Sequence, residues 1–160
     1  MNALILYRSH YGNTKLVAEA LAGELEAKGA KAQVQDLRRR LPDLGGIDLV
    51  LVGAPTRMAR VSRRALRVLK KLKKRGYASG KVAVFDTYGP IPKTPEELEK
   101  GRKWLYPGAA GLLHKAAVDL GLNVHPNTLR CEVSGMKGPL GEGEIGKARA
   151  FAAELVASRI

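Results

Sequence analysis

A short segment near the N-terminus combines the residue types that bind phosphate groups. After the apolar run from Ala3 to Tyr7, the chain reads Ser9-His10-Tyr11-Gly12-Asn13-Thr14. Ser9 and Thr14 offer hydroxyl donors, and Gly12 lets the backbone approach a ligand closely. From Thr14 onward, apolar residues recur mostly at helical spacing, so the segment is a strand-to-helix turn. The unpaired backbone N–H groups and the positive end of the helix dipole at such a turn stabilise a phosphate without a cationic side chain.

The segment alone does not decide between a phosphate site and a simple helix start. It lacks both the Gly-x-Gly-x-x-Gly pattern of dinucleotide-binding folds and the Gly-Lys-Ser/Thr pattern of nucleotide triphosphatases. An ordinary helix capped by a serine or threonine would carry the same residues. Both interpretations therefore stay open until the rest of the chain is considered.

Apolar runs and helix-period segments alternate along the chain. Strands are expected near 2–8, 31–37, 48–53, 81–86 and 128–133, and helices near 13–28, 60–75, 108–120 and 142–158. Between the second and third strands, Pro42 and Gly45-Gly46 predict only a short helical turn or a loop. The alternation predicts an α/β fold with a parallel sheet and helices on both faces. In such sheets, ligands bind beyond the carboxyl ends of the strands.

Composition predicts one domain spanning residues 1–160, because 160 residues with 45% hydrophobic content support one core and are too few for two ordinary domains. Cys131 is the only cysteine, so no internal disulfide and no Cys-x-x-Cys site can form. Because it falls within an expected strand, we expect it to be a buried small hydrophobe. No signal peptide or membrane span is evident, so the expected compartment is the cytoplasm.

The spacing around the first turn resembles the flavodoxin-like family. That family has an aromatic or aliphatic residue, then Ser/Thr, Gly/Ala and Thr, and later an Ala and an aliphatic residue at fixed spacing. This chain fills those positions with Tyr7, Ser9, Gly12, Thr14, Ala18 and Leu21. The form Ser-x-Tyr-Gly-Asn-Thr is also similar to the flavin domains of flavodiiron proteins and to certain quinone reductases.

Three later segments strengthen the resemblance. The stretch 49–57, which ends in Gly53-Ala54-Pro55-Thr56-Arg57, looks like the family's second flavin loop after strand three. The stretch 82–89 looks like the third flavin loop after strand four. The stretch 133–140 resembles the segment after strand five in short members. The resemblance therefore spans nearly the whole chain.

The resemblance implies a doubly wound, three-layer fold with strand order 2-1-3-4-5 and flavin mononucleotide (FMN) as the cofactor. In that order, the loops after strands one, three and four are neighbours. The implied FMN-binding residues are Ser9, His10, Tyr11, Gly12, Asn13 and Thr14 in the first loop, Pro55, Thr56, Arg57 and Met58 in the second, and Thr87, Tyr88 and Gly89 in the third.

Two of these residues have competing interpretations. We expect Tyr88 to stack on the flavin ring, where an aromatic side chain gains contact area and offset π contact. A surface tyrosine in a Gly-Pro turn is the alternative. Arg57 would lie near the N1/O2 edge of the ring and stabilise the reduced anion, or it is a solvated surface arginine.

The charge distribution departs from the family pattern, since typical flavodoxins are acidic around the flavin. Residues 60–75 contain nine Lys and Arg and no acidic residue, and 38–40 is Arg-Arg-Arg. These twelve cations account for all but one unit of the net charge of +13. In the flavodoxin topology both segments cover one sheet face, which predicts a continuous positive patch.

Several roles for the patch remain open. The first is the docking of an acidic redox partner protein near the 60–75 helix, and the second is an anionic membrane surface. Nucleic acid is the least expected partner, because the basic segments contain no interleaved aromatic residues and no recognition motif. A charged face that only confers solubility is the simplest alternative.

An insert follows the fourth strand. Thr94-Pro95-Glu96-Glu97 forms a capping box with proline at the first helical position, which predicts a short helix from Pro95 to about Lys103. The insert could fold over the third flavin loop as a lid. The favoured expectation is a packed connection with Trp104 buried against a neighbouring helix.

The sequence therefore predicts an FMN-binding electron carrier with no catalytic side chain and no metal site. An NAD(P)H-dependent quinone or flavin reductase is the enzyme alternative, because Ser-x-Tyr-Gly-Asn-Thr and Pro-Thr-Arg look like that branch of the family. A flavin-free basic scaffold that keeps the fold for interaction is the third hypothesis.

Overall fold

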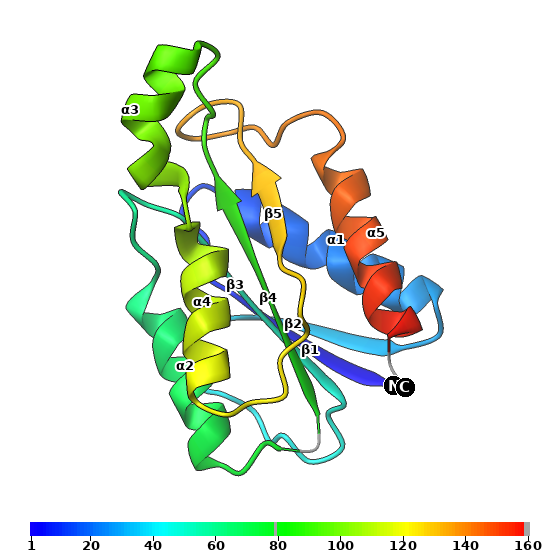
Figure 1. Ribbon diagram of the computed structural model, residues 1–160. Coiled ribbons are helices and arrows are strands. Elements are labelled where there is room, and N and C mark those ends of the chain that lie inside the picture. The colour runs from blue at the N-terminus through cyan, green and yellow to red at the C-terminus, as the bar shows by residue number, and fades with distance from the viewer. Residues whose placement is uncertain (79, 159–160) are drawn as a thin grey trace.

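A five-stranded sheet lies between two layers of helices in the computed structural model, which describes residues 1–78 and 80–158 (Figure 1). The strands are β1 (Asn2–Tyr7), β2 (Lys31–Asp36), β3 (Leu49–Pro55), β4 (Lys81–Tyr88) and β5 (Leu129–Glu132). The helices are α1 (Asn13–Ala27), α2 (Arg63–Lys74), α3 (Pro95–Leu105), α4 (Gly108–Asp119) and α5 (Glu144–Ala157). The sheet order is β2-β1-β3-β4-β5 and every neighbouring pair is parallel, which confirms the predicted flavodoxin-like α/β fold.

Most expected boundaries hold within a few residues, and the differences have local causes. The expected helix 60–75 begins only at Arg63, because Ser62 caps it by accepting a hydrogen bond from the Ala65 N–H at 3.4 Å. The fourth strand runs two residues past 86, to Tyr88, since it keeps pairing with β5 there. Between β2 and β3 the chain forms a loop, which is one of the two predicted alternatives.

Each face of the sheet carries its own apolar cluster. Helices α1 and α5 pack on one face with Ile5 and Phe85, and α2 and α4 pack on the other with Leu4 and Leu6. Successive residues of a strand point to opposite faces, so strands β1, β3 and β4 are apolar on both sides. Within the described residues, no helix is both long and apolar enough to cross a membrane.

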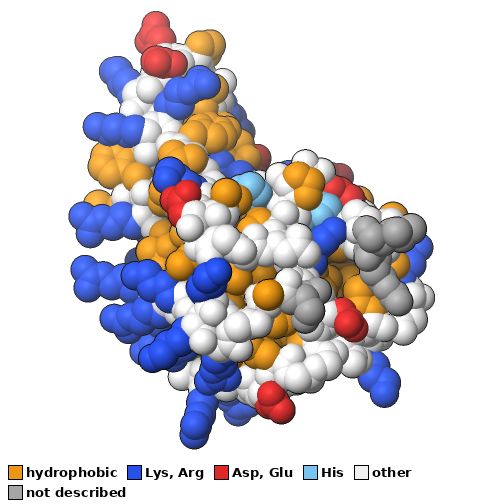
Figure 2. Space-filling view, turned by 60° about the horizontal axis from the view of Figure 1, so that its bottom comes forward, with side chains coloured by type: hydrophobic (Ala, Val, Ile, Leu, Met, Phe, Trp, Pro, Cys, Tyr) orange, Lys and Arg blue, Asp and Glu red, His pale blue; other side chains and the backbone are white. Residues whose placement is uncertain are grey.

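The two basic segments lie side by side on the α2 side of the sheet. Leu37 and Leu41, which flank Arg38-Arg39-Arg40, belong to the same apolar cluster as the buried residues of α2. Figure 2 shows Lys and Arg side chains gathered along the flank that α2 occupies, while acidic side chains are scattered. The continuous positive patch that the sequence predicted is therefore present.

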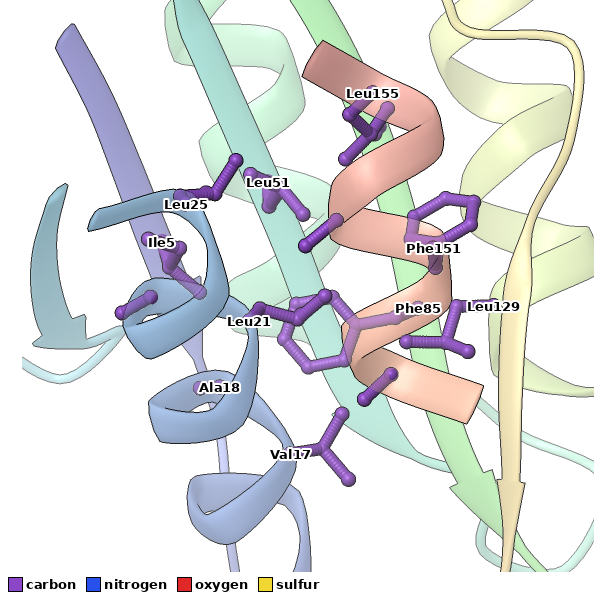
Figure 3. Packing of buried hydrophobic residues seen from close by; sticks show 14 of the residues in the cluster. Ile5, Val17, Ala18, Leu21, Leu25, Leu51, Phe85, Leu129, Phe151 and Leu155 are labelled. Atoms are coloured by element: carbon purple, nitrogen blue, oxygen red, sulfur yellow. The ribbon is translucent and has the colours of Figure 1, made fainter. Parts of the chain in front are cut away.

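The cluster beneath α1 and α5 is packed around Phe85 at its centre (Figure 3). The Phe85 ring is fully buried and lies directly over Gly53, its partner on the neighbouring strand β3. A side chain at position 53 would therefore overlap the ring. Glycine at this position makes room for an aromatic side chain in the sheet face.

We expect Gly53→Ala to lower the free energy of unfolding by about 1–3 kcal/mol, the usual cost of overpacking a core. Urea unfolding followed by circular dichroism measures the change. Gly23→Ala is the matched control, because the Cβ position of Gly23 in α1 faces open space. The control should raise the stability by about 0.5–1 kcal/mol, since alanine favours helix. A Gly53→Ala protein as stable as the parent would contradict the packing described here.

Candidate functional site

A cavity of about 300 Å³ opens at the carboxyl edge of the sheet, where the chain order reverses between β1 and β3. Three loops that are distant in sequence meet there. Its lining comprises Ser9, His10, Tyr11, Asn13, Thr14, Pro55, Thr56, Arg57, Met58, Thr87, Tyr88, Gly89, Val133 and Met136. Of the predicted FMN-binding residues, Gly12 alone does not line the cavity. The volume is at the lower end of the range for small-molecule sites.

The first loop presents the start of α1 to the cavity. Gly12 occupies the N-cap position with a φ of 92°, a left-handed conformation that strongly favours glycine. Its N–H donates to the Ser9 hydroxyl at 3.0 Å, which fixes the turn. Within the part of the chain that the structure describes, no side chain caps this helix. The first-turn N–H groups and the helix dipole therefore provide an anion-binding position.

Thr14 ties the first loop to the third. Its side chain is buried, and its hydroxyl lies 2.8 Å from the hydroxyl of Thr87 at the end of β4. The Thr56 N–H in turn donates to the Thr87 carbonyl at 2.8 Å, which joins the second loop to the third. The three loops thus share one hydrogen-bonded frame.

The second loop contains a strained turn. Arg57 and Arg60 exchange two backbone hydrogen bonds of 3.1 and 2.8 Å, and the two residues between them both have positive φ, 49° at Met58 and 64° at Ala59. Such a two-residue turn normally uses asparagine or glycine, because left-handed φ is unfavourable for other residues. The turn holds Met58 at the rim of the cavity with 76% of its surface exposed.

Arg57 contacts the first loop. Its guanidinium lies 3.2 Å from the Nε2 atom of His10. Partial burial and the nearby Arg57 and Arg8 charges lower the pKa of His10, so the ring is neutral near pH 7 and accepts the hydrogen bond from Arg57. Protonation at lower pH removes that acceptor. The predicted position of Arg57 at the flavin N1/O2 edge stays a prediction.

The ring of Tyr88 contacts two side chains that the sequence analysis did not single out, and these two also lie close to each other. The Arg130 guanidinium from β5 lies 3.8 Å above the ring centroid, and Tyr106 meets the ring edge-on at a centroid distance of 6.3 Å. Burial is the main cause that raises the pKa of Tyr88 to about 12. A flavin that stacks on Tyr88 would have to use the face opposite Arg130, and this stacking stays a prediction.

Beneath Tyr88, the carboxylate of Asp86 is completely buried and heavily hydrogen-bonded. It accepts from the Thr56 hydroxyl at 2.8 Å and from the Ala110 N–H at the start of α4 at 3.1 Å. Arg130 Nε lies 3.0 Å from each carboxylate oxygen. Burial raises the pKa of Asp86, and Arg130 is the largest opposing influence. The sequence held a signal for a buried, paired carboxylate here, because Asp86 directly follows the apolar run Val82-Ala83-Val84-Phe85.

The segment after β5 adds a fourth wall that the predicted site residues did not include. Val133 and Met136 line the cavity, and Met136 is 80% exposed. The Asn13 side-chain amide donates to the Lys137 carbonyl at 3.2 Å, which holds this segment against the first loop. The position of residues 133–140 directly after a strand was the signal that could have placed them in the site.

A second cavity of about 380 Å³ adjoins the first and shares Thr56, Met58 and Gly89 with it. Pro90, Pro92 and Trp104 add an apolar wall from the insert. The expected burial of Trp104 against a helix is wrong, because 45% of its surface is exposed. Helix α3 projects beyond the sheet in Figure 1, so Trp104 faces this cavity and not a helix layer. The expected helix itself is confirmed, with the Thr94 hydroxyl accepting from the Glu97 N–H.

Comparison with known proteins places the chain in a family. A family model described as a flavodoxin domain matches residues 4–106, and the chain therefore belongs to the flavodoxin family. A flavodoxin from Archaea has 20% sequence identity and a TM-score of 0.77, with 99% of both chains covered. Flavodoxin 1 from Bacillus cereus has 19% identity and a TM-score of 0.72, again with 99% of both chains covered.

Two further similar proteins are named as oxidoreductases, and the chain covers only part of the length of each. The chain is 29% identical over 143 residues to an NAD(P)H dehydrogenase (quinone) from Cupriavidus metallidurans, covering 74% of this chain and 69% of the relative. The rubredoxin:oxygen oxidoreductase of Desulfovibrio gigas has 15% identity and a TM-score of 0.74, with 99% of this chain and 36% of that chain covered. The predicted resemblance to the flavodoxin-like family is thus confirmed.

Replacement of Arg130 by methionine tests the buried ion pair. We expect Arg130→Met to lower the free energy of unfolding by about 3–5 kcal/mol near neutral pH, because Asp86 is left charged and buried without its cation. Without Arg130, the folded-state pKa of Asp86 rises further above its unfolded value. Between these two pKa values, the folded protein binds more protons than the unfolded chain. The variant therefore gains stability as the pH falls from the folded-state pKa to the unfolded-state pKa.

Urea unfolding at neutral and mildly acidic pH measures both effects. Arg102→Met, at an exposed arginine of α3, is the matched control and should change the stability by less than about 0.5 kcal/mol. The double variant Asp86→Asn/Arg130→Met has no buried charge and should lose the extra pH dependence. An Arg130→Met protein with the same pH profile as the parent would contradict this account.

Proposed function

We propose that this protein binds FMN and carries electrons between redox partners. The observation that supports it most is the meeting of all three predicted flavin loops in one cavity beside the uncapped N-terminus of α1. When bound, FMN would accept and release electrons, and the protein would bind, orient and shield it. Membership of the flavodoxin family supports the same proposal.

The donor set fits the two ends of FMN. The first-turn N–H groups of α1 and the hydroxyls of Ser9 and Thr14 would hold the phosphate, because an anion is stabilised there by both hydrogen bonds and the helix dipole. The flat ring would lie among Thr56, Met58 and Tyr88, which line the remaining cavity. Exposed Met58 and Met136 at the rim would limit water access to its edge.

A quinone or flavin reductase is the second candidate function. It is favoured by the relative from Cupriavidus metallidurans, which is named an NAD(P)H dehydrogenase (quinone). The adjoining cavity of about 380 Å³, with its wall of Trp104 and two prolines, offers room for a second ring beside the flavin. We further propose a cytoplasmic location, which agrees with a single cysteine that is completely buried.

Reconstitution with FMN tests the proposal directly. After desalting, we expect a flavin absorption spectrum with a one-to-one flavin content. Stepwise reduction without oxygen should then resolve two one-electron steps. Reduction by NADPH in a single step, with steady turnover of a benzoquinone, would favour the reductase. Failure to retain FMN would contradict the proposal and favour the flavin-free scaffold.

We expect Thr14→Val to weaken FMN binding by about ten- to a hundredfold, the usual effect of removing a hydrogen bond to a charged group. Fluorescence quenching of FMN on titration with the protein measures the dissociation constant. Thr128→Val makes the same change at the residue before β5, which does not line the cavity, and should leave the affinity unchanged. Equal affinities for the parent and Thr14→Val would show that the hydroxyl does not contact the phosphate.

A further inference from the structure

The nine cations of residues 60–75 have no carboxylate partner among the described residues, although Arg75 donates to the Pro42 carbonyl at 3.1 Å. Of the preceding arginine triplet, Arg38 pairs with Asp36 at 2.8 Å. The remaining positive charge is therefore available to a partner outside the chain.

A small notch lies at the centre of this surface. It has a volume of about 80 Å³, and its rim carries the cations Arg39, Arg64, Arg67 and Lys71. The floor is formed by apolar side chains of the cluster beneath α2 together with Gln35. The notch lies between α2 and the loop that joins β2 to β3, whose residues Leu37, Arg39 and Leu41 line it. Its size suits one carboxylate side chain and is too small for an FMN-sized ligand.

The surface extends to the candidate flavin cavity. Arg57 lines that cavity, Arg60 closes the same turn, and α2 begins three residues later. A macromolecule seated on α2 would therefore reach the cavity rim, where Met58 is exposed. A redox partner needs such proximity to the flavin, whereas a purely solubilising charge does not.

We propose that the face formed by α2 and Arg38-Arg39-Arg40 is the docking surface for an acidic redox protein, with one of its carboxylate side chains in the notch. This inference rests on the proposed electron-carrier function for the redox character of the partner. Charge complementarity would steer the encounter and fix the orientation. Helix α2 turns its apolar residues Val68, Leu69 and Leu72 inward, so it has no apolar face to insert into a membrane. Residues 38–40 and 60–75 contain no aromatic side chain to stack on bases.

Binding of an acidic ferredoxin tests the docking surface. Isothermal titration calorimetry with the FMN-loaded full chain, at low and at high salt, should show binding that salt weakens. The variant Arg67→Glu/Lys71→Glu, at the notch, should weaken binding about tenfold or more. The control Lys28→Glu/Arg149→Glu makes the same change in net charge in exposed residues of the opposite helix layer and should change affinity less than about threefold.

Several outcomes would overturn the proposal. They are an absence of ferredoxin binding, equal weakening by both variants, and tighter binding to phosphatidylserine vesicles or duplex DNA than to the ferredoxin. The same titration with the flavin-free chain separates this proposal from the function on which it rests. Salt-sensitive, notch-dependent binding by a chain that retains no FMN would leave the docking surface supported and the flavin proposal contradicted. Retained FMN without ferredoxin binding would overturn the docking surface alone.

Discussion

The parallel pairing of β1, β3 and β4 is the constraint on which the candidate site depends. Because the three strands run in the same direction, their carboxyl ends lie at one edge, and three loops distant in sequence leave the sheet side by side. The hydrogen bonds of Thr87 to Thr14 and Thr56 then fix the loops to one another. A register shift of one residue would break these contacts and turn each strand's apolar residues to the wrong face.

Asp86 supports this edge from beneath. A buried carboxylate is costly to desolvate, and here donors from three elements compensate it, namely the Thr56 hydroxyl, the Ala110 N–H and the Arg130 guanidinium. The same carboxylate therefore joins the second loop, the start of α4 and strand β5. Since Arg130 also stacks on Tyr88, the position of the ring proposed to contact the flavin is coupled to this network.

Hydrophobic periodicity and the spacing of the family motif were sufficient to predict the fold and most of the cavity lining. In the strand-to-helix turn 9–14, for example, the change of periodicity and the motif residues occur in the same segment. The stacking of Arg130 on Tyr88 could not be predicted in this way, since it depends on side-chain rotamers across two strands. The exposure of Trp104 was missed because burial of an aromatic residue depends on where a whole helix lies. The turn at Met58 and Ala59 was missed because its residues are not those that such turns prefer.

The charges of α2 are not explained by the stability of the helix itself. Lys71, Lys73 and Lys74 lie in its last turn, where cations interact favourably with the helix dipole. Arg63 and Arg64 lie in its first turn, where the dipole disfavours them and where the helix has no acidic residue. Like charges spaced three or four residues apart add repulsion along one face. The unfavourable cations thus lie at the N-terminal end of α2, close to the candidate flavin cavity. An interaction with an anionic partner at this position would compensate them.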